Sequence, residues 1–575
     1  MQRTALLLKT FLILFTLSAC GPQSVPQSLP TAAPSAEPFI LSPTPDILAP
    51  TEVIPESLDD IAYNEDIFAS VENCQICHKG LVDAEGNDVA NIGDWSSSIM
   101  AHAAVDPYYL ATVSAEIARH PELQAAIEDK CATCHMPMAH FAVHAAGGTS
   151  TIFGENGYKN LEHPLHEMAN EAISCTVCHQ IKDENFGDES SFSGELIFDT
   201  STAKNERVLY GPYPAEKPYA DVMQSGSGYI IEQSDHLAQS EMCATCHTLH
   251  THYLTAEGEL SESTFPEQTP YLEWLASDYA EQQSCQDCHM PKAKSEVAIS
   301  IMGSPPRSPF YLHTFTGGNA YMLEILKKFS GEIDVQSNAE NFDEAIQRTK
   351  DLLEQETATL SIESAEIVDS QLDVRVALKS LTGHKFPSGF PSRRAWLHIN
   401  VLDADGNIIF ESGSYESNGK ITGNANDEDD TLYEPHYAEI TAPEQVQIYE
   451  NIMQDTQGNV TTALLLAQTY KKDNRLLPSG FDKDTASAEI AVYGEAIKDG
   501  DFIGAEDIIH YGIKLDAASA PLTIKVELLY QSIGYRWAQN LGQEESPQID
   551  DFLRYYDETP NIPIIIASDE IKTDP

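Results

Sequence analysis

The sequence predicts an α and irregular region over residues 59–335, a linking helix over 336–357, and an all-β, sandwich-like region over 358–560. Two observations predict this division. Five Cys-x-x-Cys-His motifs lie between Cys74 and His289, roughly 40 to 70 residues apart. Beyond the linking helix, apolar and polar residues alternate with the period of two that half-buried strands require.

The repeated Cys-x-x-Cys-His motif is the attachment site of a c-type haem. Its two thiols bond to the porphyrin, and the histidine that follows becomes the proximal iron ligand. Five copies use ten of the eleven cysteines, so we expect five covalently attached haem c groups. The attachment cysteines are Cys74, Cys77, Cys131, Cys134, Cys175, Cys178, Cys243, Cys246, Cys285 and Cys288. The proximal ligands are His78, His135, His179, His247 and His289.

Zinc and disulfide interpretations of these cysteines fit less well. A structural zinc site needs two Cys-x-x-Cys pairs, or one pair with spaced histidines, and five pairs is an odd number. Zinc also gives no reason for a histidine directly after every second cysteine. Cysteines three residues apart rarely form structural disulfides, and a thioredoxin-like redox motif would not recur five times.

The remaining cysteine, Cys20, belongs to an export signal over residues 1–19. Basic residues precede a short apolar run, Phe11–Leu17, which is too short to span a membrane as a mature helix. The sequence Leu-Ser-Ala-Cys resembles the bacterial lipoprotein box, which implies cleavage before Cys20 and lipidation of its thiol. An ordinary signal peptide is the alternative. No later apolar run could cross a bilayer, so the lipid would be the membrane anchor.

Residues 20–58 are rich in Pro, Ser, Thr, Ala and Glu and predict a disordered tether. The mature protein would then be held at the outer face of a bacterial membrane, in the periplasm or at the cell surface. This compartment agrees with the haem motifs, because c-type haem is attached outside the cytoplasm.

The chain is strongly acidic, with 89 Asp and Glu against 33 Lys and Arg and a formal net charge of −56. Nucleic acid and anionic lipid surfaces are poor partners for such a field, so we expect no nucleic acid. A solvated acidic surface is the simplest interpretation. A more specific interpretation of the negative charge is electrostatic steering of a basic redox partner protein.

Closely spaced haems leave little polypeptide for each porphyrin, so the macrocycles are expected to supply much of the interior of the first region. Helices are predicted within 107–128 and 268–283. In the second region, Trp396–Phe410 predicts a β-hairpin and Leu522–Tyr530 a further strand. Residues 561–575 are expected to form a C-terminal tail.

Each haem iron has one further axial position. A second histidine there makes a low-spin electron carrier, a methionine raises the potential, and an open position allows substrate chemistry. The chain has fourteen histidines outside the motifs, enough for five distal ligands.

Four segments resemble one family of multihaem cytochromes. Asp94–Pro107 resembles its W-x-x-S-x-H-A helix, and Cys285–Pro291, His313–Asn319 and Thr382–Gly389 are similar to further segments. The family is the cytochrome c-552/4 domain family, which includes the tetrahaem cytochrome of ammonia oxidisers and larger relatives. The resemblance covers most of residues 70–560.

The resemblance implies distal ligands at His313 and His384, and its spacing adds His166 and His236. In the first segment the family's histidine falls on Met100, and His102 follows two residues later. Two residues on a helix are about 200° apart, so Met100 and His102 cannot both face one iron. Either residue ligates, or one haem stays open. The reserve candidates are His140, His144 and His163.

These observations favour an electron-transfer protein that acts between respiratory partners and needs no catalytic residues. One alternative is an oxidoreductase that acts on a small nitrogen or sulfur compound at an open haem, with Arg393 and Arg394 near His384 to attract an anion. Another is a subunit of an extracellular haem assembly, with the β region as the docking module.

Overall fold

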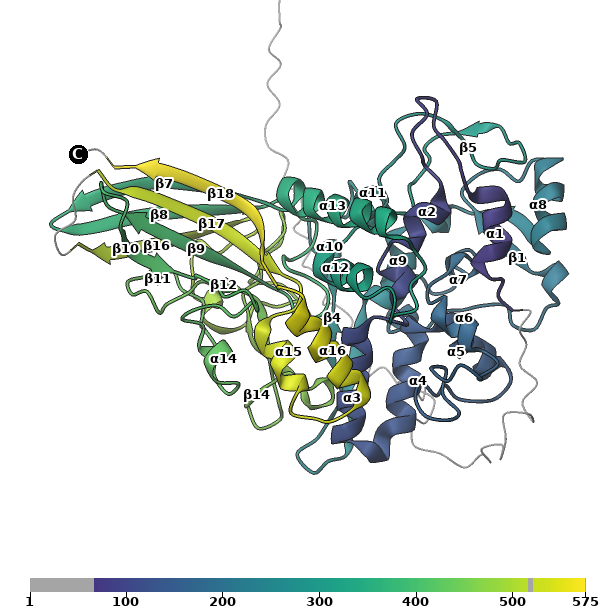
Figure 1. The fold of residues 1–575 in the computed structure, drawn as a ribbon, viewed down its shortest axis with the longest axis horizontal. Coiled ribbons are helices and arrows are strands. Elements are labelled where there is room, and N and C mark those ends of the chain that lie inside the picture. Colours follow the sequence, from purple (N-terminus) through teal and green to yellow (C-terminus); the bar gives the residue numbers. More distant parts are fainter. Residues whose placement is uncertain (1–66, 516–520, 574–575) are drawn as a thin grey trace, which may run out of the picture. The chain divides into compact units, whose positions relative to one another are not determined.

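The computed structural model describes residues 67–515 and 521–573, all of which belong to one compact unit (Figure 1). The expected signal peptide, Cys20 and the tether lie outside the described residues. Among the described helices, none is both long enough and apolar enough to cross a membrane. We call residues 67–335 the motif region and residues 358–573 the β region.

Each Cys-x-x-Cys-His motif lies on or at the end of a short helix. The five helices are α1 (Val71–His78), α4 (Gln124–His135), α7 (Cys175–Cys178), α9 (Ser240–His247) and α11 (Cys285–His289). Helical neighbours three and four residues apart share one face, so both cysteines and the histidine of a motif point the same way. Side chains of Ser70 and Ser284 cap α1 and α11 and fix where these helices begin.

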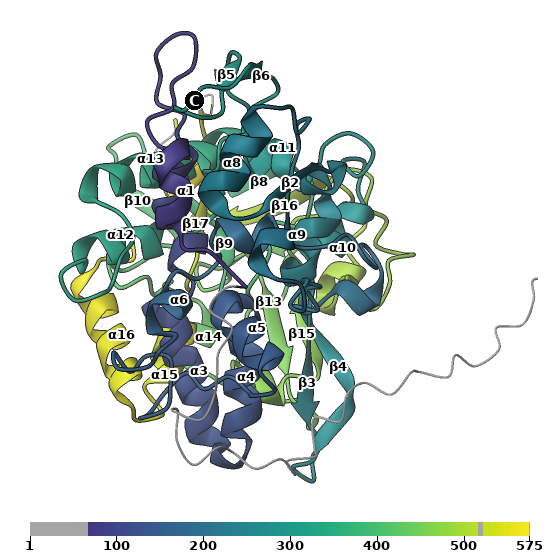
Figure 2. The ribbon, with the colours of Figure 1, turned by 90° about the vertical axis from the view of Figure 1, so that its right-hand side faces the viewer.

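Short elements fill the rest of the motif region, which faces the viewer in Figure 2. Its other helices are α2 (Asn91–Ser96), α3 (Pro107–Arg119), α5 (Pro137–Ala145), α6 (His166–Asn170), α8 (Tyr219–Ser227), α10 (Pro270–Leu275) and α12 (Ala320–Lys328). Three strand pairs are β1 (Val208–Gly211) with β2 (Ile230–Gln233), β3 (Leu249–Leu254) with β4 (Leu260–Gln268), and β5 (Val297–Ala298) with β6 (Pro306–Arg307).

The helices of this region are shorter than the sequence predicts. The stretch 107–128 is divided between α3 and α4, because Pro121 disfavours helical geometry at the residue before it. Within 268–283 only α10 is helical. Helix α13 (Ala339–Glu356) then leads into the β region, inside the range predicted for the linking helix, and Asn338 caps its first turn.

The β region contains three sheets. The first has the order β11-β16-β8-β7, the second β10-β9-β17-β18 with β12 paired to β9, and the third β14-β13-β15. The strands are β7 (Ala358–Val368), β8 (Gln371–Ser380), β9 (Arg394–Leu402), β10 (Ile408–Ser412), β11 (Glu439–Ile440), β12 (Ile448–Tyr449), β13 (Asn451–Gln454), β14 (Val460–Thr461), β15 (Thr469–Asp473), β16 (Glu506–Lys514), β17 (Thr523–Gln531) and β18 (Ile564–Lys572).

The first two sheets share one hydrophobic cluster. It includes Val374 and Val376 of β8, Ile399 of β9, and Val526 and Leu528 of β17, all buried. Inward residues alternate with outward ones along β8, as the period of two predicts. Strands β9 and β10 pair in antiparallel fashion around the predicted turn.

Two predictions for this region are wrong. Residues 561–575 are not only a tail, because β18 pairs with β17 from Ile564 to Lys572. The region is also not all-β, because it contains α14 (Ala425–Glu428), α15 (Tyr535–Leu541) and α16 (Pro547–Glu558). Ser546 caps α16 and Pro547 occupies its first turn. This pair of residues is a local signal for the start of a helix, which the alternation of apolar and polar residues does not reveal.

Candidate haem sites

Four of the five motif histidines are oriented by a hydrogen bond from Nδ1 to a backbone carbonyl. The pairs are His78 with Ile299 at 2.8 Å, His135 with Ala103 at 2.8 Å, His179 with Tyr210 at 2.7 Å, and His289 with Thr316 at 2.6 Å. A carbonyl oxygen only accepts, so Nδ1 carries the proton and Nε2 keeps its lone pair. That tautomer is the one in which Nε2 binds a metal.

Burial keeps these rings neutral. It lowers the pKa of His135 and of His247 to about 4, and it lowers the pKa of His78, His179 and His289 below the ordinary histidine value. At neutral pH each ring therefore offers a lone pair and not a second proton.

Two motif histidines face a predicted distal histidine. The ring centres of His179 and His313 are 6.4 Å apart with planes 11° from parallel. Those of His289 and His384 are 6.3 Å apart with planes 5° from parallel. One metal ion bonded to a nitrogen of each ring at about 2 Å, an ordinary metal–imidazole distance, would separate the ring centres by about 6 Å. Each pair therefore fits the two axial positions of one iron.

The loop that carries His384 is held by buried charges. Lys385 donates from its backbone to Glu273 at 3.1 Å and from Nζ to Asp473 at 2.8 Å. Arg475 bridges Asp473 and Glu273, with both nitrogen–oxygen distances at 2.8 Å. Glu273 lies on α10 of the motif region and the other three lie in the β region, so this network joins the two regions directly beside His384.

His236 is the third predicted distal ligand with an available nitrogen. Nδ1 lies 2.6 Å from the Ser234 hydroxyl, and Nε2 is buried without a well-formed hydrogen bond, although the Ile181 backbone carbonyl lies near the ring. Its ring lies beside Tyr210, whose carbonyl orients His179. An orphaned buried nitrogen is costly unless something binds it, which fits an axial ligand.

His166 has partners at both nitrogens. Nδ1 lies 2.7 Å from the Tyr158 carbonyl, and Nε2 lies 3.0 Å from the Asn170 amide nitrogen. Coordination through Nε2 would require Asn170 to move.

Of the two alternatives at the first segment, His102 has hydrogen-bond partners at both ring nitrogens. His102 is fully buried, with Nδ1 2.8 Å from the Ser98 carbonyl and Nε2 accepting the backbone N–H of Gln336 at 3.0 Å. Neither nitrogen has a lone pair to spare in this arrangement. Met100 begins a short 3₁₀ turn and is half-buried.

The reserve histidines have local partners. His140 and His144 lie on α5 beside Asp129. His163 accepts the backbone N–H of Leu165 at 3.0 Å.

The ten described cysteines are free thiols, and several lie against a thiol of another motif. Side-chain hydrogen bonds join Cys74 to Cys175, Cys134 to Cys246, and Cys243 to Cys285. These contacts join the first motif to the third, and the fourth motif to the second and the fifth.

The contact between Tyr109 and the second motif is not predicted by the sequence. The Tyr109 ring stacks on His135 with ring centres 3.6 Å apart and planes 2° from parallel, and its hydroxyl is buried without a hydrogen-bond partner. In the described part of the chain, no histidine ring is recorded opposite His135. Tyr109 lies in the segment that resembles the family helix, but nothing in its spacing marks it.

The two arginines considered for anion binding have different surroundings. Arg394 is buried and paired with Asp427 through both terminal nitrogens, at 2.8 and 3.0 Å, so it is structural. Arg393 donates to the Ser388 carbonyl at 2.6 Å and acts electrostatically on His247 and His289.

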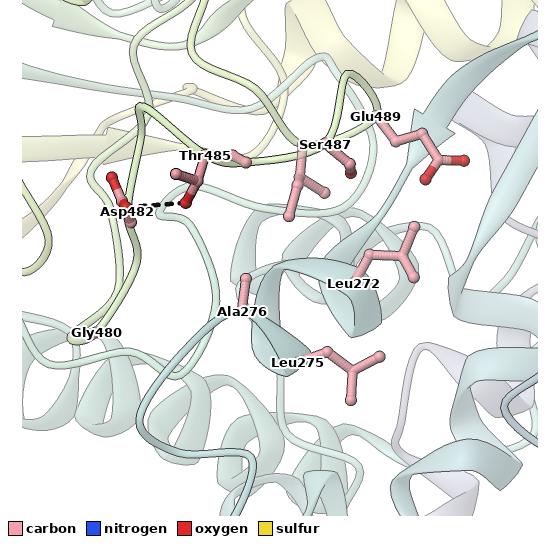
Figure 3. Close-up of a pocket in the computed structure, with 10 residues that line it drawn as sticks. Leu272, Leu275, Ala276, Gly480, Asp482, Thr485, Ser487 and Glu489 are labelled. Atoms are coloured by element: carbon pink, nitrogen blue, oxygen red, sulfur yellow. Dashed lines mark hydrogen bonds between the residues drawn. The ribbon is translucent and has the colours of Figure 1, made fainter. Parts of the chain in front are cut away.

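A pocket of about 440 Å³ lies between α10 and residues 480–490 (Figure 3). Asp482 and Thr485, joined by a 2.8 Å hydrogen bond, lie on one side, and Leu272, Leu275 and Ala276 on the other. No motif cysteine or histidine lines it. This pocket is therefore separate from the cysteine and histidine residues of the candidate haem sites.

Comparison with known proteins gives one structural likeness. A penta-heme cytochrome c552 from Thermochromatium tepidum is similar with a TM-score of 0.49 and 16% sequence identity, over 88% of this chain and 100% of that chain. No protein-family profile and no curated protein sequence matches.

Proposed function

We propose that this chain is a pentahaem c-type cytochrome that transfers electrons between respiratory partners. The observation that carries the proposal is the pair of parallel imidazole couples, His179 with His313 and His289 with His384, each spaced for one iron. Bound haem supplies reversible one-electron iron chemistry. A six-coordinate iron needs no substrate and changes little in geometry when it is oxidised, which suits a carrier.

The polypeptide has three roles in this proposal. The motif cysteines hold the porphyrins, the Nδ1 hydrogen bonds fix each imidazole, and the distal histidines close the coordination. The thiol contacts between motifs support the transfer function, because they bring attachment points of neighbouring haems together.

The cellular setting belongs to the proposal as well. We place the mature chain outside the cytoplasm, lipid-anchored through Cys20 and the 20–58 tether, with a sandwich-like β region after the haem-wrapped one. The net charge of −56 favours a basic redox partner.

A second candidate function rests on the second haem motif. Among the described residues the ring recorded against His135 is that of Tyr109, stacked beside this proximal ligand, and no histidine ring faces it, which favours an open distal position on this haem. Reduction or oxidation of a small nitrogen or sulfur compound would then occur at that iron.

The test begins with the mass of the mature chain, made in a host competent for cytochrome maturation. Five added porphyrins are expected, and a chain of bare mass would contradict both functions. Electron paramagnetic resonance of the oxidised protein should show low-spin signals from the two paired sites. His384→Ala should convert one of them to high spin, whereas the exposed His510→Ala should change none.

Carbon monoxide separates the two functions. A reduced protein whose visible spectrum does not respond to carbon monoxide supports the carrier. A carbon monoxide response of the reduced protein, together with a high-spin signal from the second haem in the oxidised protein, would support the catalytic alternative instead.

A further inference from the structure

Helix α5 presents two histidines four residues apart, His140 and His144, to a carboxylate on α4. One donor atom from each of His140, His144 and Asp129 lies within 4.8 Å of the other two. A histidine pair at this helical spacing points to one side of the helix, as chelation of a single ion requires.

The donors converge on Asp129 Oδ1. His144 Nε2 lies 2.8 Å from it and His140 Nδ1 lies 3.7 Å from it, and the two rings are 4.1 Å apart between centres. Ligands bonded to one ion at about 2.0 to 2.2 Å lie roughly 3 to 4 Å from each other. Both measured distances are close to that range without any bound ion.

We propose that Asp129, His140 and His144 bind one divalent transition-metal ion of the Zn²⁺ type, separate from the haem sites. Two imidazoles and one carboxylate suit Zn²⁺ and its first-row neighbours, and not Ca²⁺ or Mg²⁺, which take oxygen ligands. Three protein ligands leave a fourth position for water. His144 is exposed, so an ion can enter from solvent.

The proton arrangement permits this site. His140 Nδ1 lies 3.0 Å from the Ser150 hydroxyl, whose hydrogen can rotate away. The Ser150 backbone N–H donates to Asp129 Oδ1 at 2.7 Å, which holds the carboxylate in place. Neither contact blocks the nitrogen of His140 that faces Asp129.

A second cluster of the same kind shows the contrast. His436, Asp499 and Asp507 also lie within 4.8 Å of one another. There, however, Nδ1 of His436 receives amide N–H groups from Gln447 at 2.8 Å and Asn474 at 3.1 Å.

Both amides are fixed in that orientation. The Gln447 oxygen accepts the Tyr437 backbone N–H, and the Asn474 oxygen accepts that of Glu450. His436 must therefore carry its proton on Nε2 and donate it to Asp499, so it has no lone pair for an ion. This cluster carries no metal proposal.

The experiment uses the full-length haem-loaded protein, stripped with a chelator and titrated with Zn²⁺ in high salt. Calorimetry should show one binding event for each chain, and elemental analysis should count one retained zinc separately from iron. His144→Ala should weaken binding by at least about tenfold. Asp129→Asn, which keeps the shape of the side chain, should weaken it similarly, whereas His510→Ala should leave it unchanged.

No zinc retention, or equal affinity in His144→Ala, would overturn the site. Conversion of a low-spin haem signal to high spin in His140→Ala would also overturn it, because His140 would then be an axial haem ligand. Since iron and zinc are counted separately, failure of this site leaves the haem count intact, and failure of the haem proposal appears in the iron count.

Discussion

The motif region and the β region bury their apolar side chains in different ways. In the β region one large cluster joins inward residues of two sheets, including Val376, Ile399 and Leu528. In the motif region the clusters are smaller and include residues of the cysteine motifs themselves, such as the cluster around Met138, Val177 and Leu196. The β region therefore has one large protein core, whereas the apolar side chains of the motif region are divided among several clusters.

This difference implies that the two regions gain their stability from different kinds of packing. Short helices with scattered clusters can surround cofactors closely, but they gain little stability from their own packing. A sheet core buries apolar area independently of any cofactor. The loop of the β region that carries His384 reaches the fifth cysteine motif, where its ring faces that of His289.

Loss of haem should give the largest contrast between the regions. When the chain is made without cytochrome maturation, we expect amides of the motif region to exchange at least about 100-fold faster than in the haem-loaded protein. Amides of β8, β9 and β17 should keep most of their protection. Hydrogen exchange followed by mass spectrometry measures both, and uniform loss across the two regions would refute the comparison.

Breaking the network between the regions should have the next largest effect. Glu273→Ala leaves Arg475 and Lys385 buried with one acceptor fewer, which should cost about 3 to 5 kcal/mol of unfolding free energy. The low-spin signal of the haem between His289 and His384 should also shift, because the loop loses its anchor. Urea unfolding and electron paramagnetic resonance measure the two effects.

The matched control for that change is Glu262→Ala on β4, an exposed carboxylate. It should alter neither measurement. A shift in the resonance signal from the control as large as that from Glu273→Ala would refute the anchoring role.

Core truncation should sharpen the comparison with a smaller effect. Leu528→Ala in the shared sheet cluster should cost about 4 kcal/mol, and Leu196→Ala in the small motif-region cluster about 2 kcal/mol. Haem content should stay at its original value in both. An equal or reversed order in urea unfolding of the haem-loaded protein would mean that the motif region has a protein core as continuous as that of the β region.

The smallest expected effect is a pH dependence in the β region. Burial raises the pKa of Asp507, which accepts the Tyr449 hydroxyl at 2.6 Å, to about 6. The pKa of Asp507 in the folded protein exceeds its unfolded value of about 4. Its contribution to the free energy of unfolding is therefore fully present below pH 4, where the carboxyl is protonated in both states, and is lost as pH rises through 6.

Asp507→Asn removes that titration. The variant should therefore gain stability relative to the original protein between pH 4 and pH 7, by at most about 2 to 3 kcal/mol. Urea unfolding at both pH values measures the gain. The exposed Asp484→Asn should show no such trend, and a flat difference for Asp507→Asn would contradict the assigned titration.

Local patterns could predict much of the chain. The alternation along β8 and the turn between β9 and β10 depend on neighbouring residues, and the structure contains both. The sequence does not predict strand β18, because its pairing partner β17 lies before two intervening helices. The division of 107–128 at Pro121 follows from a local property of the sequence, since Pro disfavours helical geometry at the residue before it.

In the candidate sites, too, some features follow from local sequence and others only from tertiary packing. The sequence by itself determined where cysteines and histidines share a helical face, because three- and four-residue spacing is a property of the backbone. Only the tertiary structure decided which carbonyl orients each ring, with Ile299 lying 221 residues from His78, and that His313 faces His179. It also decided that Asp129 meets the α5 histidine pair. Such contacts come from packing between distant segments, and no local periodicity records them.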